Sequence, residues 1–259
     1  ELLNFLAGPL VKGIIWILER IFQKKVEERI SIYLVGANGV GKTTFMTALK
    51  NQLKFPDDIR DYKRTSGLVS HSIEHSIGKE KYKLLFYDYA GDSGSIKTRD
   101  KTIVEKKPIV ILFFVDHNNT RELIPKDKRN ASYSEIEEWE NENKHILSEI
   151  SQTRIDDQYE HFDSLIQLFK EGTIHKNVTI ILVATKYDLW HPQLETHDFH
   201  TNFQDKIREL LTQTTNVSNI NSISSLKRHG LERLLNEICK VSAREYKIFN
   251  WTFQRYPLQ

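Results

Sequence analysis

The 259-residue sequence contains a single cysteine, Cys239, and a single methionine. One cysteine excludes a disulfide framework within the chain and any zinc site built from several cysteines. We therefore expect a reducing compartment, which favours a cytoplasmic location. An excess of one charge is also absent, since 37 basic and 35 acidic residues give a net charge of +2. This balance gives no reason to expect nucleic acid as a partner.

Long apolar runs are scarce apart from the first 25 residues. Pro9 suits the first turn of a helix, and four apolar residues after it share one helical face: Leu10, Ile14, Ile17 and Ile21. Charged residues such as Lys12 and Glu19 would each cost roughly 2.5–3.5 kcal/mol at a bilayer centre. The pattern favours an amphipathic helix packed on the protein or on a partner. A helix lying on a membrane surface and a membrane-spanning helix are the alternatives.

From residue 30 onward, strand-like apolar runs alternate with helical patterns, which is typical of an α/β fold. The predicted strands are residues 30–35, 83–89, 108–115, 178–185 and, more weakly, 219–224. Helices are predicted from residue 43, around Phe162, over 194–213 and over 231–241. The runs at 108–115 and 178–185 are apolar almost throughout, as central parallel strands are. We expect a three-layer sandwich, with a mostly parallel central sheet and helices on both faces.

About forty charge-rich residues, 118–157, interrupt this alternation. Within them, Ser134 and Glu137 form a capping-box pattern that predicts a helix continuing through Trp139, Leu147 and Ile150. A loop of this length either binds a partner or is a solvated decoration. The predicted organisation is an N-terminal amphipathic helix (1–28), a main domain (29–245) with this helical insertion, and an aromatic tail (246–259). The first residue is Glu1 rather than Met, which is consistent with a piece of a longer protein.

The strongest motif is GANGVGKT, residues 36–43, which follows a predicted strand and opens a predicted helix. Gly-x-x-x-x-Gly-Lys-Thr in this context predicts the phosphate-binding loop of a P-loop NTPase. Its glycines let backbone N–H groups point inward at phosphate oxygens. Lys42 would bridge the β- and γ-phosphates, and the Thr43 hydroxyl would ligate Mg²⁺. The expected nucleotide contacts here are Asn38, Gly39, Val40, Gly41, Lys42, Thr43 and Thr44.

Thr185-Lys186-Tyr187-Asp188, at the end of a predicted strand, indicates which base is bound. The Asp188 carboxylate can accept hydrogen bonds from N1–H and the N2 amine of guanine. Adenine offers neither donor at that edge, so the carboxylate would lose its partners. The aliphatic part of Lys186 can lie along the base. These residues favour a guanine nucleotide and argue against an ATP-using P-loop enzyme.

In this order the motifs resemble the Ras-like small GTPases of the translation-factor-related P-loop class, over roughly residues 30–243. That family usually has Asn where this chain has Thr185, although its Rho branch also uses Thr. The resemblance implies further base contacts from the loop of Ser224, Ser225 and Leu226, with the Ser225 N–H meeting the guanine O6.

The resemblance also locates the first switch at Thr65-Ser66-Gly67, similar to the segment of Rab, Arf and Gα proteins. Thr65 lies 23 residues before Asp88. The implied role of Thr65 is to join Mg²⁺ when triphosphate is bound, with Ser66 and Ser70 as rival ligands.

The second switch corresponds to FYDYAGDSG, residues 86–94. The resemblance implies that Asp88 holds Mg²⁺ through a water and that the Gly91 N–H touches the γ-phosphate. The next residue in Ras-like enzymes is usually the glutamine that orients the attacking water, and here it is Asp92. An ionised aspartate is shorter and can only accept hydrogen bonds. Three alternatives follow. Asp92 points away, and hydrolysis is slow until a partner completes it, or Asp92 orients the attacking water in an altered geometry. In the third alternative, the protein binds GTP nearly without hydrolysing it.

The predicted function is a guanine-nucleotide-dependent molecular switch with slow, Mg²⁺-dependent GTP hydrolysis. The expected cofactors are GTP or GDP and Mg²⁺. The expected catalytic residues are Lys42, Thr65, Gly91 and Asp92. The expected metal ligands are Thr43, Thr65 and Asp88. The alternative is a pseudo-GTPase scaffold that holds its nucleotide with little turnover. Expected partners are an effector and activating or exchange proteins, with residues 9–25 meeting a membrane surface or a partner helix.

Overall fold

The computed structural model describes residues 28–50, 67–78, 80–89, 96–118, 123, 125, 133–147, 149–190, 196–214, 216–225 and 229–242. The predicted N-terminal helix (apart from Glu28) and the predicted aromatic tail (246–259) lie outside these residues. Within the described ranges, no helix has both the length and the apolar character needed to cross a bilayer.

The described strands form one six-stranded sheet in the order β2-β3-β1-β4-β5-β6. Their bounds are β1 Glu28–Val35, β2 Leu68–Ile77, β3 Glu80–Tyr89, β4 Val110–Val115, β5 Thr179–Ala184 and β6 Val217–Ser222. Only the β2–β3 pair is antiparallel; the other four pairings are parallel. The mostly parallel sheet predicted from the sequence is therefore confirmed.

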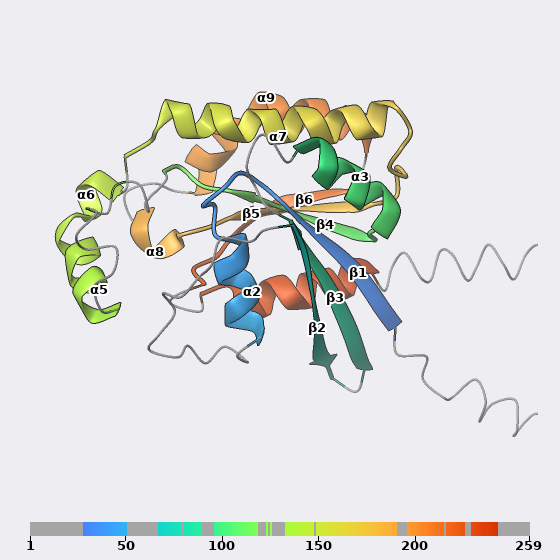
Figure 1. Ribbon diagram of the computed structural model, residues 1–259, viewed down its shortest axis with the longest axis horizontal. Helices are drawn as coiled ribbons and strands as arrows, with labels where there is room; N and C mark the ends of the chain where they lie inside the picture. Colours follow the sequence, from blue (N-terminus) through green and yellow to red (C-terminus); the bar gives the residue numbers. More distant parts are fainter. Residues whose placement is uncertain are drawn as a thin grey trace, which may run out of the picture.

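Helices cover both faces of this sheet (Figure 1). Their bounds are α2 Lys42–Lys50, α3 Ile96–Lys106, α5 Tyr133–Glu142, α6 Lys144–Leu147, α7 Gln152–Lys170, α8 Tyr187–Trp190, α9 Thr196–Gln213 and a last helix over 231–242. The helices α2 and 231–242 pack on one face, where Phe45 and Leu234 join the core. On the other face lie α3, α7 and α9, contributing Ile103, Phe162 and Phe203. The three-layer sandwich is confirmed.

The sequence pattern of the central strands explains these two cores. In β1, Ile30, Ile32 and Leu34 face one cluster, while Tyr33 and Val35 face the other. All six residues of β4 and all six of β5 are buried. A strand covered by helices on both faces needs apolar residues at every position, which is why these two runs do not alternate.

Two elements differ from the sequence analysis. Strand β2 was not predicted; its residues alternate between exposed and half-buried along the sheet edge. The helix expected to open at Ser134 and continue through Ile150 begins within one residue of its predicted start, at Tyr133, but it is interrupted at Asn143 and α6 ends at Leu147. At this interruption Trp139 O accepts two bonds from Asn143, one from the backbone N–H over 3.0 Å and one from the side-chain amide over 2.8 Å. Ile150 is 45% exposed and lies beyond α6.

The parallel arrangement gathers the motifs at one edge. The phosphate loop follows β1, Asp88 lies near the end of β3, and Thr185 follows β5 directly. Because the carboxyl ends of parallel strands share one edge, these residues meet although they are far apart in sequence.

Candidate nucleotide-binding site

The loop between β1 and α2 has the backbone that a phosphate cradle requires. Gly36, Gly39 and Gly41 have φ angles of 141°, 74° and 98°, in the region that favours glycine. A Cβ at Gly36 would lie 2.6 Å from the backbone oxygen of Phe114, so no side chain fits there. The loop leads directly into α2, which begins at Lys42. Strand, glycine loop and helix therefore occur in the order that the motif predicted.

The Lys42 ammonium folds back over its own loop. It donates to Gly36 O over 2.6 Å and to Ala37 O over 3.0 Å. The residue is 7% exposed, and this burial lowers the pKa of Lys42 to about 8, against an opposing effect of Asp88. Anionic phosphate oxygens are stronger acceptors than backbone carbonyls, so this ammonium is placed to exchange its carbonyl partners for phosphate.

Two of the predicted Mg²⁺ ligands lie side by side. The Thr43 hydroxyl donates to Asp88 Oδ2 over 3.1 Å, and Asp88 is buried. The parallel register of β1 and β3, which pairs Leu34 with Asp88, brings this carboxylate to the loop. Mg²⁺ in nucleotide sites binds one or two protein oxygens and completes its shell with phosphates and waters. A hydroxyl and a carboxylate beside a phosphate loop fit that donor set, and no larger cluster of metal-binding side chains occurs in the described part of the chain.

The predicted switch residues Thr65, Gly91 and Asp92 lie outside the described residues. Helix α3, which follows the predicted second-switch segment, is attached to α7 through Arg99. The Arg99 Nη2 donates to Ser164 Oγ over 2.6 Å, and the Arg99 guanidinium pairs with Asp100. This anchor fixes the helix that follows Asp92 in the chain.

Thr185 connects the predicted base motif to the phosphate loop. Its hydroxyl donates to Val40 O over 2.7 Å and lies 3.3 Å from Val115 O. The residue is buried, and a Cβ on Gly41 would meet its side chain at 3.8 Å. Thr185 thus fixes the distance between β5 and the loop that would hold the phosphates.

Lys186 adopts a left-handed backbone conformation, with φ of 59°. Its ammonium forms an ion pair with Asp116 and donates to Asn118 O over 2.8 Å. Burial lowers the pKa of Lys186, and the neighbouring Asp116 opposes that shift. Asp188 follows in α8 and is half-buried, so its carboxylate keeps access to solvent or a ligand.

The loop after β6 lies against this base motif. Tyr187 stacks on His229, with ring centroids 4.3 Å apart and planes 8° from parallel. Ser224 is buried, and its backbone N–H donates to His229 O over 3.1 Å. Of the three residues expected to contact the base, Ser225 is half-buried in a turn, and Leu226 lies outside the described residues.

Three residues that contact the motif residues were not predicted from the sequence. Asp116, Asn118 and Arg154 all bond to Lys186 or to the phosphate loop. Asp116 directly follows the buried strand β4, and the rule that polar residues at strand ends gather at one edge could have identified it. Arg154 carries no comparable signal, because it lies in the first turn of α7 in no recognisable motif, and its burial follows only from the tertiary fold.

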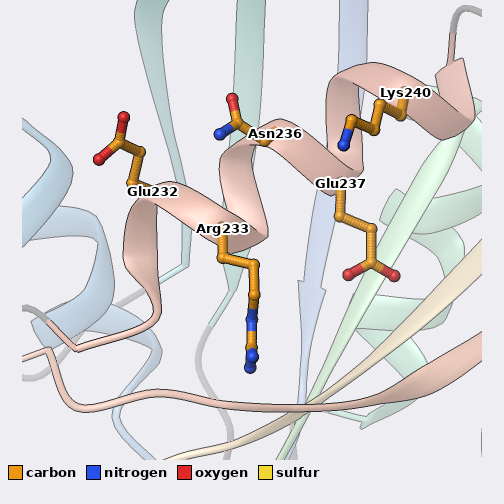
Figure 2. A pocket seen from close by; sticks show the side chains of 5 residues that line it. All are labelled: Glu232, Arg233, Asn236, Glu237 and Lys240. Atoms are coloured by element: carbon orange, nitrogen blue, oxygen red, sulfur yellow. The ribbon is translucent and has the colours of Figure 1, made fainter.

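A separate surface pocket does not include these motifs. It lies along the helix 231–242 and is lined by Glu232, Arg233, Asn236, Glu237 and Lys240. Figure 2 shows that all five side chains come from that one helix and point to different sides of it. With two acidic and two basic residues, the pocket favours neither an anion nor a cation.

The comparisons with known proteins agree with the geometry at the strand ends. A family model described as 50S ribosome-binding GTPase matches residues 31–186, which include the phosphate loop, Asp88, Thr185 and Lys186. A search of curated proteins finds no match. The family match covers more than half of the chain, and the chain therefore belongs to this family of P-loop GTPases.

Proposed function

We propose that this protein is a molecular switch of the Ras-like type that binds GTP or GDP with Mg²⁺ and hydrolyses GTP slowly. The observation that carries the proposal is the meeting of three motifs at one sheet edge. Thr43 touches Asp88, and Thr185 touches Val40, so the metal-binding, phosphate-binding and base-binding motifs are in direct contact. A structural glycine turn would need neither contact.

In the proposed complex, the backbone N–H groups of residues 38–44 and the Lys42 ammonium hold the phosphates. Thr43, Asp88 and, in the triphosphate state, Thr65 hold Mg²⁺. The chemistry that Mg²⁺ supplies when bound is neutralisation of charge on the phosphate oxygens. Asp188 selects guanine through the two donors on its Watson–Crick edge, and the Lys186 stem lies along the base.

Asp92 sets the expected rate. It is one methylene shorter than glutamine and cannot donate a hydrogen bond when ionised. It also adds negative charge beside an anionic γ-phosphate. We therefore propose slow intrinsic hydrolysis that an activating partner completes, while the two switches present the nucleotide state to an effector.

The substitution at position 92 also favours a second candidate. A chain without the usual glutamine can retain GTP or GDP as a structural cofactor and act as a scaffold. Tight binding without turnover in every variant would identify this pseudo-GTPase function.

Single-turnover assays with GTP, and with ATP as control, test the proposal. The natural protein is compared with Asp92→Gln, Asp92→Ala and Lys42→Ala. We expect slow turnover of GTP and none of ATP, faster turnover in Asp92→Gln, and weakened nucleotide binding in Lys42→Ala. Loss of activity in Asp92→Ala would instead make Asp92 part of the catalytic machinery. A preference for ATP would overturn the guanine assignment.

A further inference from the structure

Three charged residues form a buried network between α7, β4 and the base motif. The Arg154 Nε donates to Asp116 Oδ1 over 2.6 Å, and its Nη2 donates to Asp116 Oδ2 over 3.2 Å. Lys186 pairs with the same carboxylate. Arg154 and Asp116 are 3% and 1% exposed, so water does not screen this interaction. One carboxylate therefore holds two cations, one of which belongs to the predicted base motif.

Arg154 also reaches the phosphate loop. Its third nitrogen, Nη1, donates to Asn38 O over 2.8 Å, although the two residues are 116 positions apart. A planar guanidinium can make these bonds together because its donors are fixed in a fork, whereas a lysine ammonium acts as a single point charge. The side chain of Arg154 is thus bonded at once to the phosphate loop and to the partner of Lys186.

The backbone around Asp116 is held in place from α7. The Gln158 side chain accepts a bond from Asp116 N over 2.8 Å and donates one to Asp116 O over 2.7 Å. Both polar backbone groups of Asp116 are thereby occupied. The carboxylate cannot move toward or away from Lys186 without breaking bonds to helix α7.

The end of the long insertion joins the same network. Ser151 N donates to His117 O over 3.0 Å, and the Asn118 side chain donates to Glu149 O over 3.1 Å. Asn118 O in turn accepts from Lys186. The polypeptide that returns from α5 and α6 is therefore connected to the base motif immediately before α7 begins.

Lys186 needs such support because of its backbone. A non-glycine residue with φ of 59° is in a conformation that its own side chain disfavours. Such conformations persist where surrounding contacts enforce them. The contacts of its side chain with Asp116 and Asn118 O, together with the bond that Lys186 O accepts from Leu189 N over 2.9 Å, provide such support.

We propose that Arg154 is a positioning residue for nucleotide binding, which holds the phosphate loop at Asn38 and orients Lys186 through Asp116. The inference rests on the proposed guanine-nucleotide function and adds to it a residue outside the GTPase motifs. Its consequence is that nucleotide retention depends on helix α7 and on the end of the insertion. The chemistry of hydrolysis does not involve Arg154 in this proposal.

The test is the dissociation rate of a fluorescent GDP analogue from the full chain. Arg154→Met removes the side-chain bonds to Asp116 and Asn38. Arg154→Lys keeps a positive charge beside Asp116 but loses the planar guanidinium that makes these bonds together. We expect dissociation to be faster by about tenfold or more in Arg154→Met, and by less in Arg154→Lys, since a conservative change rescues part of the effect. Asp116→Asn keeps the shape of the site and provides a second variant if Arg154→Met does not fold.

The matched control is Phe162→Leu, on the same helix and fully buried in the core away from the motifs. It lowers the melting temperature without touching Asn38 or Asp116, and we expect its dissociation rate to stay within about twofold of the natural protein. If Arg154→Met and Asp116→Asn release GDP no faster than this control at an equal loss of melting temperature, Arg154 is only structural and the inference is overturned. Failure of the natural chain to bind the GDP analogue would overturn the proposed function itself, which is a separate result.

Discussion

Thr43 Oγ1 lies 3.1 Å from Asp88 Oδ2, although 45 positions separate the two residues. The contact exists because β1 and β3 run parallel and in register, which carries the end of β3 to the start of α2. A hydroxyl from the phosphate loop and a carboxylate from the neighbouring strand thus form one small oxygen-rich site. The arrangement makes the proposed Mg²⁺ site directly testable.

Thr43→Val keeps the side-chain shape and removes the oxygen. In the natural protein, we expect chelation of Mg²⁺ by EDTA to accelerate GDP release by about tenfold or more. In Thr43→Val, release should already be fast, and EDTA should change it little. The control is Thr47→Val, one turn further along α2. An equal EDTA effect in Thr43→Val and the natural protein would contradict the metal-ligand role.

Thr185 offers a second test, because its hydroxyl is the link to Val40. Thr185→Val leaves the Val40 carbonyl buried without this donor, which should lower the free energy of unfolding by about 1–3 kcal/mol. Thr185→Ser keeps the hydroxyl, and we expect a smaller loss. Urea denaturation of the nucleotide-free protein measures both. A larger loss in Thr185→Ser than in Thr185→Val would show that the methyl group, rather than the hydroxyl, matters.

Much of the fold was predictable because its strands are continuous or alternating apolar runs. The continuous apolar runs of β4 and β5 predict buried parallel strands, because helical segments separate them in the sequence. Strand β2 was missed because LVSHSIEHSI has only four apolar residues, Leu68, Val69, Ile73 and Ile77, which do not alternate regularly with polar ones. Three of them are half-buried at the sheet edge and Leu68 is exposed, so the signal is weak.

The site was predictable only in part. The phosphate loop, Asp88 and Thr185 carry local motifs, and the structure brings them together. Arg154 was not predictable, because its partners lie 38 and 116 positions away and nothing local distinguishes it from a solvent-facing arginine. Burial of a charged residue is a property of the tertiary fold, and it leaves no periodic pattern in one helix.

Two glycines should be irreplaceable for a steric reason. A Cβ at Gly36 would meet Phe114 O at 2.6 Å, and one at Gly230 would meet Ser222 O at 2.4 Å, both backbone atoms. We expect Gly36→Ala and Gly230→Ala to lower the free energy of unfolding by about 3 kcal/mol or more, through strain and overpacking together.

The control is Gly78→Ala in the β2–β3 turn. Its φ of 59° is also positive, but no atom lies within 4 Å of the added Cβ. Only the backbone strain of about 1–2 kcal/mol remains. Thermal or urea unfolding distinguishes the two cases. Losses of equal size at all three positions would show that the close contacts are relieved by small backbone movements.

The buried Lys42 predicts two pH effects of opposite sign. Burial lowers the pKa of Lys42 from 10.5 to about 8 in the folded chain. Phosphate oxygens favour the charged ammonium and should raise its pKa in the complex, so affinity for GDP should fall as pH rises through about 8. In the nucleotide-free protein, the contribution of Lys42 to the free energy of unfolding should change in the opposite direction and rise with pH. The unfolded chain keeps the proton up to its own pKa of 10.5, and the folded chain loses it first, so stability from Lys42 rises between those values.

Titration of GDP binding between about pH 7 and about pH 9, with urea unfolding over the same range, separates the two effects. Lys42→Met serves as the comparison, because it removes the titrating group and should flatten both contributions while weakening nucleotide binding. If affinity in the natural protein does not fall above pH 8 relative to Lys42→Met, the ammonium does not exchange its bonds to Gly36 and Ala37 for bonds to phosphate. Lys42 would then only stabilise the conformation of its own loop, and the phosphates would be bound by the backbone N–H groups alone.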